Sequence, residues 1–341
     1  MEDQTMLSTD VGRGVLSFRL TTRACRQWRR ELVGLEYPDP AATAELEEFV
    51  QRSREIANRY LPRGIVASMK AVGEAHGPLA VVVRDGPTDS HVPAPPTDGL
   101  RPQDKAESIS EGYLCGCVAA AGEPFDYYQK GYSSFITQVA PATGFEDSNS
   151  GASKEPLGEH TDNSILLPQF QTDDINLTTL VNDAKVPTWI CDTRELLDLL
   201  SHDEIADLAE ARYRYPLPYN LSGADVEMWT APRPILRLRE GASPEIALSP
   251  LGIRGVDGEA DMSFSALRRA IRNVAGVSIN LRPGDFLRFS NRFSIHGRRG
   301  AIKGSRWLQR LYSRGELNTL RERTVSAPPI RMFDQRLLIL D

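Results

Sequence analysis

The second half of the chain is a succession of short β-rich runs separated by turn residues, and this pattern restricts the fold more than any other. The runs are DINLTTLVN (174–182), VPTWICD (186–192), RYRYPLP (212–218), PILRLRE (234–240), GVSINLRPGDFLRFSN (276–291) and RWLQRLYS (306–313). Many short strands with turn signals between them predict a sandwich or a barrel, and they lack the regular strand–helix alternation of a doubly wound fold. Helical spacing interrupts the strands only at 193–211 and 263–275.

The first 75 residues predict a mostly helical region that packs on this core. In DPAATAELEEFVQRSREIANRYLP (39–62), Asp39-Pro40 is a candidate helix cap, and apolar residues recur at helical spacing. Further signals are a strand in PLAVVVRDGP (78–87), a helix in DKAESISEGYLCGCVAAAG (104–122) and a strand in SSFITQVAP (133–141). We therefore expect a helical region 1–75, a β-rich core 76–314 and a C-terminal tail 315–341.

Charge and cysteine content narrow the class of protein and its compartment. The formal net charge of the 341-residue chain is −6 and no basic stripe is present, so nucleic acid and anionic membranes are poor candidate partners. The four cysteines, Cys25, Cys115, Cys117 and Cys191, suggest neither a disulfide framework nor a zinc site. No apolar run reaches about 18 residues and no signal-peptide segment is visible, so we expect the reducing cytoplasm.

The motif GEHTDNS places His160 and Asp162 two positions apart. Side chains at positions i and i+2 of a strand project to the same face, so both could reach one metal ion, whereas on a helix they would diverge. The alternative is a pair of polar loop residues. The motif follows a long polar stretch without periodicity, TGFEDSNSGASKEPLGE (143–159). Loops of this length in a compact domain are usually functional or disordered, and we expect this one to act as a lid.

A third metal ligand is available far downstream, in His296. It ends an extended run that follows the turn Pro283-Gly284-Asp285. Together with His160 and Asp162 it would supply two imidazoles and one carboxylate, the facial triad that holds non-heme Fe(II) and leaves three positions open. The alternative is a strand-end histidine bonded to a backbone carbonyl.

Arg306 and Arg310, in RWLQR, follow His296 at an even spacing that aims both guanidinium groups at one face of a strand. Two inward arginines in a barrel would require anionic partners. A dicarboxylate cosubstrate would provide them, because the guanidinium fork grips a carboxylate through two hydrogen bonds. The alternative is two exposed arginines on an edge strand.

From about residue 75 to 314 the chain resembles the Fe(II)/2-oxoglutarate-dependent oxygenases of the taurine dioxygenase and clavaminate synthase type. The matching stretches are HTD (160–162), GDFLRFSNRFSIHGR (284–298) and RWLQR (306–310). The resemblance implies an α+β protein with a mainly β core, a double-stranded β-helix (jelly roll) with flanking helices. It also implies iron bound by His160, Asp162 and His296, with 2-oxoglutarate and O2 as cosubstrates. The chain departs from the family at Ser290, where an aspartate is common.

The resemblance further implies that Arg306 holds the distal carboxylate of 2-oxoglutarate with the help of a threonine. Thr188 matches best, and Thr178 and Thr179 are nearby alternatives. Arg310 would lie near the keto-acid end or the substrate.

By family analogy the expected reaction is hydroxylation of a C–H bond of a small polar substrate, an amino acid or an amino-acid-derived intermediate of antibiotic biosynthesis. The alternatives are the same chemistry on a sulfonate or another small anion for nutrient scavenging, desaturation or ring closure in place of hydroxylation, and a non-catalytic jelly-roll binding protein.

Two further residues are candidate substrate contacts, Glu159 and Arg239. In relatives that hydroxylate arginine, the strand corresponding to PILRLREGAS (234–243) continues with acidic residues, whereas this chain has Arg239 there. If Arg239 faces the pocket, it would disfavour a basic substrate side chain. The alternative is that Arg239 points to solvent and pairs with Glu240 or Glu245.

Overall fold

A nine-stranded sheet runs through the molecule. The computed structural model describes residues 5–10, 14–128, 134–145, 148–218, 228–324 and 330–339. The sheet has the order β1-β2-β3-β14-β7-β16-β4-β17, with β5 paired to β16. Its strands are β1 (Thr5–Asp10), β2 (Val15–Leu20), β3 (Ala80–Arg84), β4 (Glu123–Tyr128), β5 (Thr137–Val139), β7 (Asp174–Asn182), β14 (Phe286–Ser290), β16 (Arg306–Arg314) and β17 (Met332–Asp334).

A second sheet of four strands has the order β13-β8-β15-β6. Its strands are β6 (Leu157–His160), β8 (Thr188–Asp192), β13 (Val277–Ile279) and β15 (Ser294–Arg298). Two short antiparallel pairs complete the β structure, β9 (Tyr213–Arg214) with β12 (Arg254–Gly255) and β10 (Leu236–Arg237) with β11 (Glu245–Ile246). Leu177 and Leu308 of the large sheet and Ile295 of the small one belong to one buried cluster, so the two sheets share a core.

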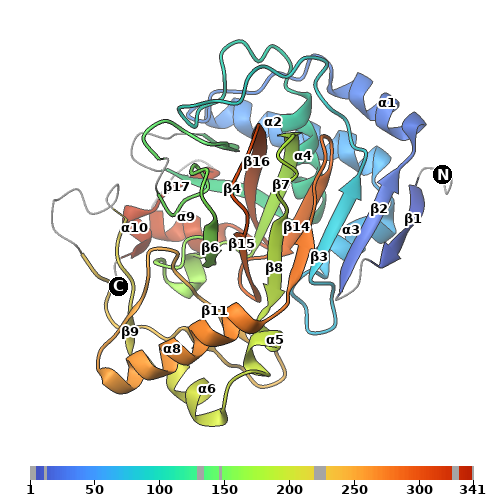
Figure 1. Ribbon diagram of the computed structural model, residues 1–341. Helices are drawn as coiled ribbons and strands as arrows, with labels where there is room; N and C mark the ends of the chain where they lie inside the picture. The colour runs from blue at the N-terminus through green and yellow to red at the C-terminus, as the bar shows by residue number, and fades with distance from the viewer. Residues whose placement is uncertain are drawn as a thin grey trace.

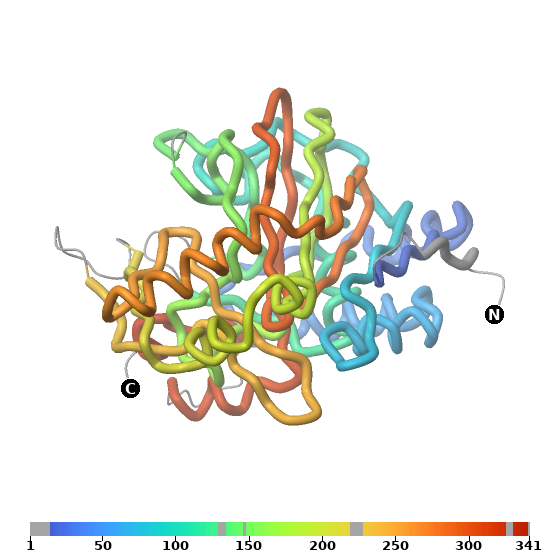
Figure 2. The backbone as a smooth tube through the Cα atoms, turned by 60° about the horizontal axis from the view of Figure 1, so that its bottom comes forward, coloured from blue at the N-terminus to red at the C-terminus, as the bar shows by residue number. Residues whose placement is uncertain are grey.

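Helices cover the remaining faces. Figure 1 shows α1–α4 together on one side of the large sheet, and α5, α6 and α8 at the bottom of the view. In Figure 2, where that bottom comes forward, α8 (orange) lies across the front. The helices are α1 (Thr22–Leu32), α2 (Thr43–Tyr60), α3 (Arg63–Lys70), α4 (Ile109–Ala121), α5 (Thr193–Leu197), α6 (His202–Leu208), α8 (Gly258–Asn273), α9 (Asn318–Thr324) and α10 (Arg336–Ile339), with the 3-10 turn η2 (Pro168–Phe170).

The apolar run of β3 shows how the layers are joined. Val81 and Val83 pack into the cluster formed with α1, α2 and α4, while Ala80 and Val82 belong to the core shared by the two sheets. Successive residues of a strand point to opposite faces, so a strand covered on both sides is apolar throughout rather than alternating. The result is a mixed α and β molecule built on a large, mainly antiparallel sheet.

The strand-rich second half and the helices near 109–121, 193–208 and 258–273 agree with the sequence prediction. The N-terminal region differs, because β1 and β2 precede its helices and β2 pairs in parallel with β3. The predicted cap at Asp39 is also corrected. Asp39 accepts hydrogen bonds from the N–H groups of Ala41 and Ala42 in a turn, and α2 begins only at Thr43.

The segment 315–341, predicted to be a tail, is part of the folded core as far as it is described. It forms α9, β17 and α10, and β17 extends the large sheet by pairing in parallel with β4. Leu320, Phe333 and Leu338 are fully buried. Their burial fixes the segment through contacts distant in sequence, which local patterns do not reveal. Among the described residues, no helix is both long and apolar enough to span a membrane.

Candidate metal centre

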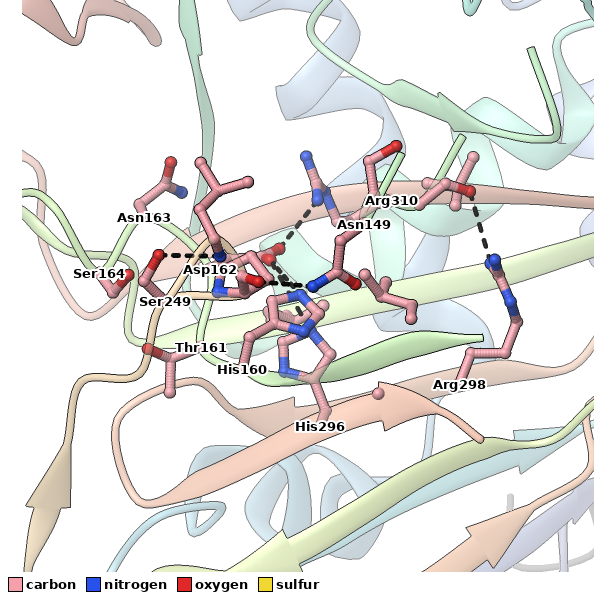
Figure 3. A pocket seen from close by; sticks show the side chains of 18 of the residues that line it. Asn149, His160, Thr161, Asp162, Asn163, Ser164, Ser249, His296, Arg298 and Arg310 are labelled. Carbon is pink, nitrogen blue, oxygen red and sulfur yellow. Dashed lines mark hydrogen bonds and ion pairs between the residues drawn. The ribbon is translucent and has the colours of Figure 1, made fainter. Parts of the chain in front are cut away.

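His160, Asp162 and His296 meet in one place, as their sequence context predicted. His160 ends β6 and pairs with His296 of β15, so the two imidazole rings lie side by side with centroids 4.3 Å apart. The Nε2 atoms of His160 and His296 lie 3.2 and 3.7 Å from Oδ1 of Asp162. One ligand atom from each residue lies within 4.8 Å of the others, and Figure 3 shows the three side chains converging. This donor set fits a divalent metal of the Fe(II) type.

Both imidazoles are suited to bind a metal through Nε2. Nδ1 of His160 makes a 2.8 Å hydrogen bond with the carbonyl of Gly158, which fixes the ring and leaves Nε2 free. Burial, followed by the neighbouring His160, lowers the pKa of His296 to about 3, so this imidazole is neutral near pH 7. Neutral imidazole is the form that coordinates metals.

Asp162 is held by both its backbone and its side chain. Asn291 accepts a hydrogen bond from the Asp162 N–H and donates one to its carbonyl, at 2.7 and 2.9 Å. Oδ2 of Asp162 accepts hydrogen bonds from Arg310 and from the Tyr312 hydroxyl, each 2.8 Å long. Burial alone would raise the pKa of Asp162, but Arg310 and the two histidines hold it well below its ordinary value. The residue is therefore a carboxylate whose Oδ1 remains available to a metal.

These side chains line a cavity of about 750 Å³ between the two sheets. Its walls come from β6, β7, β8, β15 and β16 and from the loops 148–151, 163–165 and 249–251. Asn149 ties the first loop to the wall, since its side chain donates to the carbonyl of Pro250 at 2.5 Å and accepts from the N–H of Gly158 at 3.1 Å. Of the predicted lid 143–159, Phe145, residues 148–151 and Leu157 line the cavity, and residues 146–147 fall outside the described residues.

Arg306 lies in the same cavity and is 5% exposed. In the part of the chain that the structure describes, its side chain makes no hydrogen bond or ion pair, and its Nε is buried without an acceptor. Burial, with a smaller effect of Arg298, lowers its pKa to about 9. A buried guanidinium group without a counterion requires an anionic partner, and the cavity offers room for one.

Of the three candidate threonines, Thr188 of β8 lines the cavity. Thr178 points elsewhere, because its hydroxyl donates to the carbonyl of Asp285. Thr179 does not belong to the lining set; it pairs with Leu308 of β16, two positions from Arg306. The geometry therefore favours Thr188 as the hydroxyl that could assist Arg306.

The alternation along β16 puts Arg306, Leu308, Arg310 and Tyr312 on the cavity side, as the even spacing predicted. On the other face, Gln309 donates to Glu111 of α4 at 3.0 Å. Arg310 differs from Arg306 because it already has an anionic partner in Asp162. Its guanidinium group also lies 4.4 Å from the centroid of the Tyr312 ring.

The predictions for Glu159 and Arg239 are corrected. Glu159 precedes His160 in β6 and is not among the cavity residues; its carboxylate accepts a 2.8 Å hydrogen bond from Arg299 instead. Arg239 follows β10 and is exposed to solvent, also away from the cavity. Glu245, one of its expected partners, is held by Arg237 and Arg292. Arg239 thus gives no information about the substrate.

Sequence reasoning did not identify two residues that complete the site. Asn291 follows the departure from the family at Ser290 and holds the Asp162 backbone. Its signal in the sequence was its match to the family beside that departure. Gln335 comes from the C-terminal segment, where it lines the cavity and hydrogen-bonds Asn163. Nothing in the local sequence around Gln335 indicates this position.

Comparisons with known proteins agree with the resemblance seen in the sequence. No family model matches the chain. It is 25% identical over 315 residues to enduracididine beta-hydroxylase of Streptomyces hygroscopicus, covering 84% of this chain and 91% of that protein. Asparagine oxygenase, solved with Fe(II), 2S,3S-3-hydroxyasparagine and succinate, has a TM-score of 0.77 at 20% identity and covers 94% of this chain and 99% of its own. The non-heme iron oxygenase OrfP, solved with Fe and alpha-ketoglutaric acid, has a TM-score of 0.75 at 22% identity, with 93% and 99% covered.

Proposed function

We propose that this chain, which has the fold of the Fe(II)/2-oxoglutarate-dependent oxygenases, hydroxylates a C–H bond of a small polar substrate, an amino acid or a derivative of one. The observation that carries the proposal is the His160–Asp162–His296 cluster in one cavity with the buried Arg306, for which the described residues provide no partner. The first supplies the ligands of iron and the second the site of an anionic cosubstrate. In this view the two sheets that share the core are the two halves of a jelly roll.

His160, Asp162 and His296 would hold Fe(II), and Arg306 with Thr188 would hold the distal carboxylate of 2-oxoglutarate. Bound iron and 2-oxoglutarate would supply the oxidising chemistry, in which O2, 2-oxoglutarate and the substrate give succinate, carbon dioxide and the hydroxylated substrate. One oxygen atom of O2 would enter the substrate C–H bond and the other the new carboxylate of succinate. Arg306 orients the cosubstrate through the planar fork of its guanidinium group. The apolar side chains Leu177, Leu308 and Phe289, which also line the cavity, keep water away from it.

The charges around the cavity bear on the class of substrate. Among the described lining residues, Asp162 is the one acid, and three arginines line the same cavity, Arg298, Arg306 and Arg310. Arg298 is held by the carbonyls of Ser153 and Glu155, both at 2.6 Å. We propose on this basis a substrate with a carboxylate and a neutral or acidic side chain, as in asparagine, rather than a guanidinium group. The sequence analysis disfavoured a basic substrate side chain because of Arg239, and the cavity charges now replace Arg239 as the basis for that hypothesis.

A role in natural-product biosynthesis is proposed from the relatives, whose names include enduracididine beta-hydroxylase. The same cavity charges would also suit a sulfonate or another small anion, the second candidate substrate class. All four cysteines are free, which fits the proposed cytoplasmic location.

The test is an anaerobic titration of the protein with Fe(II) and 2-oxoglutarate, followed through the visible charge-transfer band of the chelated cosubstrate. Candidate substrates are then added, and those that shift the band are assayed with O2 for succinate and for a product heavier by one oxygen atom. A protein that develops no band and forms no substrate-dependent succinate is not an oxygenase of this class. A product of unchanged oxygen content that lacks two hydrogens would instead show desaturation or ring closure.

A further inference from the structure

The two oxygens of the Asp162 carboxylate have different surroundings. Oδ1 is the oxygen that lies 3.2 and 3.7 Å from the Nε2 atoms of the two histidines. Oδ2 points the other way and accepts two hydrogen bonds, from Arg310 and from the Tyr312 hydroxyl, both 2.8 Å long. One oxygen thus faces the metal ligands, and the other is occupied by protein donors.

This division matters because a carboxylate can bind a metal through one oxygen or through both. The proposed reaction needs three open positions on iron, two for 2-oxoglutarate and one for O2. A carboxylate bound through both oxygens would take one of the three. Donors held on Oδ2 oppose that arrangement, because a second metal–oxygen contact would compete with two hydrogen bonds to a charged acceptor.

We propose that Tyr312 is a positioning residue that reserves Oδ2 and keeps Asp162 a metal ligand through Oδ1 alone. This rests on the proposed function of the site. Arg310 contributes to the same task, but it lines the cavity with its side chain 19% exposed, so an anionic ligand can compete for its remaining N–H groups. The Tyr312 hydroxyl has Asp162 as its acceptor, and its ring is only 2% exposed.

The packing of Tyr312 explains why its hydroxyl is fixed. Its ring centroid lies 6.2 Å from that of Phe125 and 5.8 Å from that of Tyr127, and Arg310 covers it at 4.4 Å. These contacts leave the phenol little rotational freedom. The hydrogen bond to Asp162 therefore forms at small entropic cost, and it persists when Arg310 turns to a ligand.

Tyr127 provides a matched control. It is also 2% exposed and belongs to the same aromatic cluster, but its hydroxyl donates to the carbonyl of Phe170 at 2.5 Å. Tyr127→Phe and Tyr312→Phe each remove one buried hydroxyl and one hydrogen bond. Only the second removes a bond to a metal ligand.

The experiment measures Co(II) binding to the full-length wild-type protein and to both variants, without 2-oxoglutarate, by titration and by visible absorption. Residues that orient metal ligands typically contribute about 10–100-fold to metal affinity. We expect Tyr312→Phe to weaken Co(II) binding by about tenfold or more and to change the shape of the Co(II) d–d spectrum. Tyr127→Phe should match the wild type in both readouts.

The outcomes separate this inference from the proposed function. If the wild type binds no Co(II), or binds it equally well after His160→Ala, the metal centre itself is wrong. If the wild type binds Co(II) through His160 but Tyr312→Phe has the same affinity and spectrum, the role of Tyr312 is overturned. Equal losses in both tyrosine variants would also overturn it, because they would reflect packing of the aromatic cluster.

Discussion

Replacing Arg306 with leucine is expected to weaken 2-oxoglutarate binding without destabilising the protein that lacks it. The guanidinium group is buried, and no partner for it is found among the described residues. A pKa that burial lowers from 12.5 to about 9 corresponds to a cost on the order of 4–5 kcal/mol for the isolated charge, an upper bound because water can enter the cavity. Leucine removes this cost and retains most of the apolar contacts of the arginine stem.

Although the substitution should not destabilise the protein, it should weaken the binding of 2-oxoglutarate. A charge-assisted pair with a carboxylate, together with the penalty of leaving that carboxylate unpaired, amounts to about 2–5 kcal/mol. The dissociation constant of 2-oxoglutarate should therefore rise by more than about tenfold in Arg306→Leu. Anaerobic calorimetric titration in the presence of Fe(II) measures this change, and urea unfolding of the metal-free protein measures stability.

Arg306→Lys is the matched control, since it keeps the charge but loses the fork that grips both carboxylate oxygens. Arg306→Lys should weaken 2-oxoglutarate binding less than Arg306→Leu does. It should also retain the free-energy cost of a buried positive charge. If the dissociation constant of 2-oxoglutarate is unchanged in Arg306→Leu, then Arg298 or Arg310, rather than Arg306, contacts its distal carboxylate. A large loss of stability in the same variant would mean that Arg306 has a structural partner, which would refute its assignment as a vacant anion site.

Four further experiments test the metal ligands, the substrate class and a buried acid outside the cavity lining. His160→Ala or His296→Ala removes one of three protein ligands, so Fe(II) affinity measured by titration should fall steeply and succinate formation should stop; near-wild-type turnover at ordinary Fe(II) supply would contradict the triad. Asp162→Gly should abolish hydroxylation, measured by product mass, because the one carboxylate ligand is lost. In a panel of amino acids, those with neutral or acidic side chains should support coupled succinate formation, and efficient turnover of free arginine or lysine would refute the substrate class. Asp126→Asn tests a buried acid near Arg310 that is not part of the cavity lining: burial, opposed mainly by Arg310, raises the pKa of Asp126 to about 7. The folded state therefore holds this proton more tightly than the unfolded chain, whose aspartate has a pKa near 3.8, so wild-type stability should fall between about pH 4 and 7 as the proton is lost. The free energy of unfolding in urea should therefore fall in the wild type but not in Asp126→Asn across that range. If the two proteins show the same pH dependence, the raised pKa of Asp126 is contradicted.

Strand alternation accounts for some of the residues that sequence reasoning placed at the cavity. Arg306 and Arg310 share a face of β16 because their spacing is even. Asp162 lies two residues beyond the end of β6, so Asn291 and not strand alternation holds it beside His160. The same rule, applied to Glu159, puts its side chain on the face opposite His160. Its direction away from His160 was thus accessible from the pattern, whereas its pairing with Arg299, a residue distant in the chain, was not.

Other features depended on contacts that no local pattern encodes. The pairing of β2 with β3 and of β17 with β4 joins segments far apart in the chain, in parallel registers that short turns cannot set. Gln335 reaches the cavity only because β17 is held at the edge of the large sheet. Arg239 lies two residues beyond β10, a strand of only two residues, so the alternation rule does not fix its direction.

The two arginines of β16 separate what residue spacing predicts from what depends on tertiary contacts. Four residues apart on one face, Arg306 and Arg310 were equivalent by spacing, and both were assigned to an anionic cosubstrate. The fold places Arg310 against Asp162, whereas the charged group that acts on the pKa of Arg306 is the like-charged Arg298. The cavity therefore has one end where positive charge is compensated and another where it is not. In the proposed function, Arg306 is therefore the arginine available to an anionic cosubstrate, and this difference follows from the partners of the two arginines rather than from their spacing.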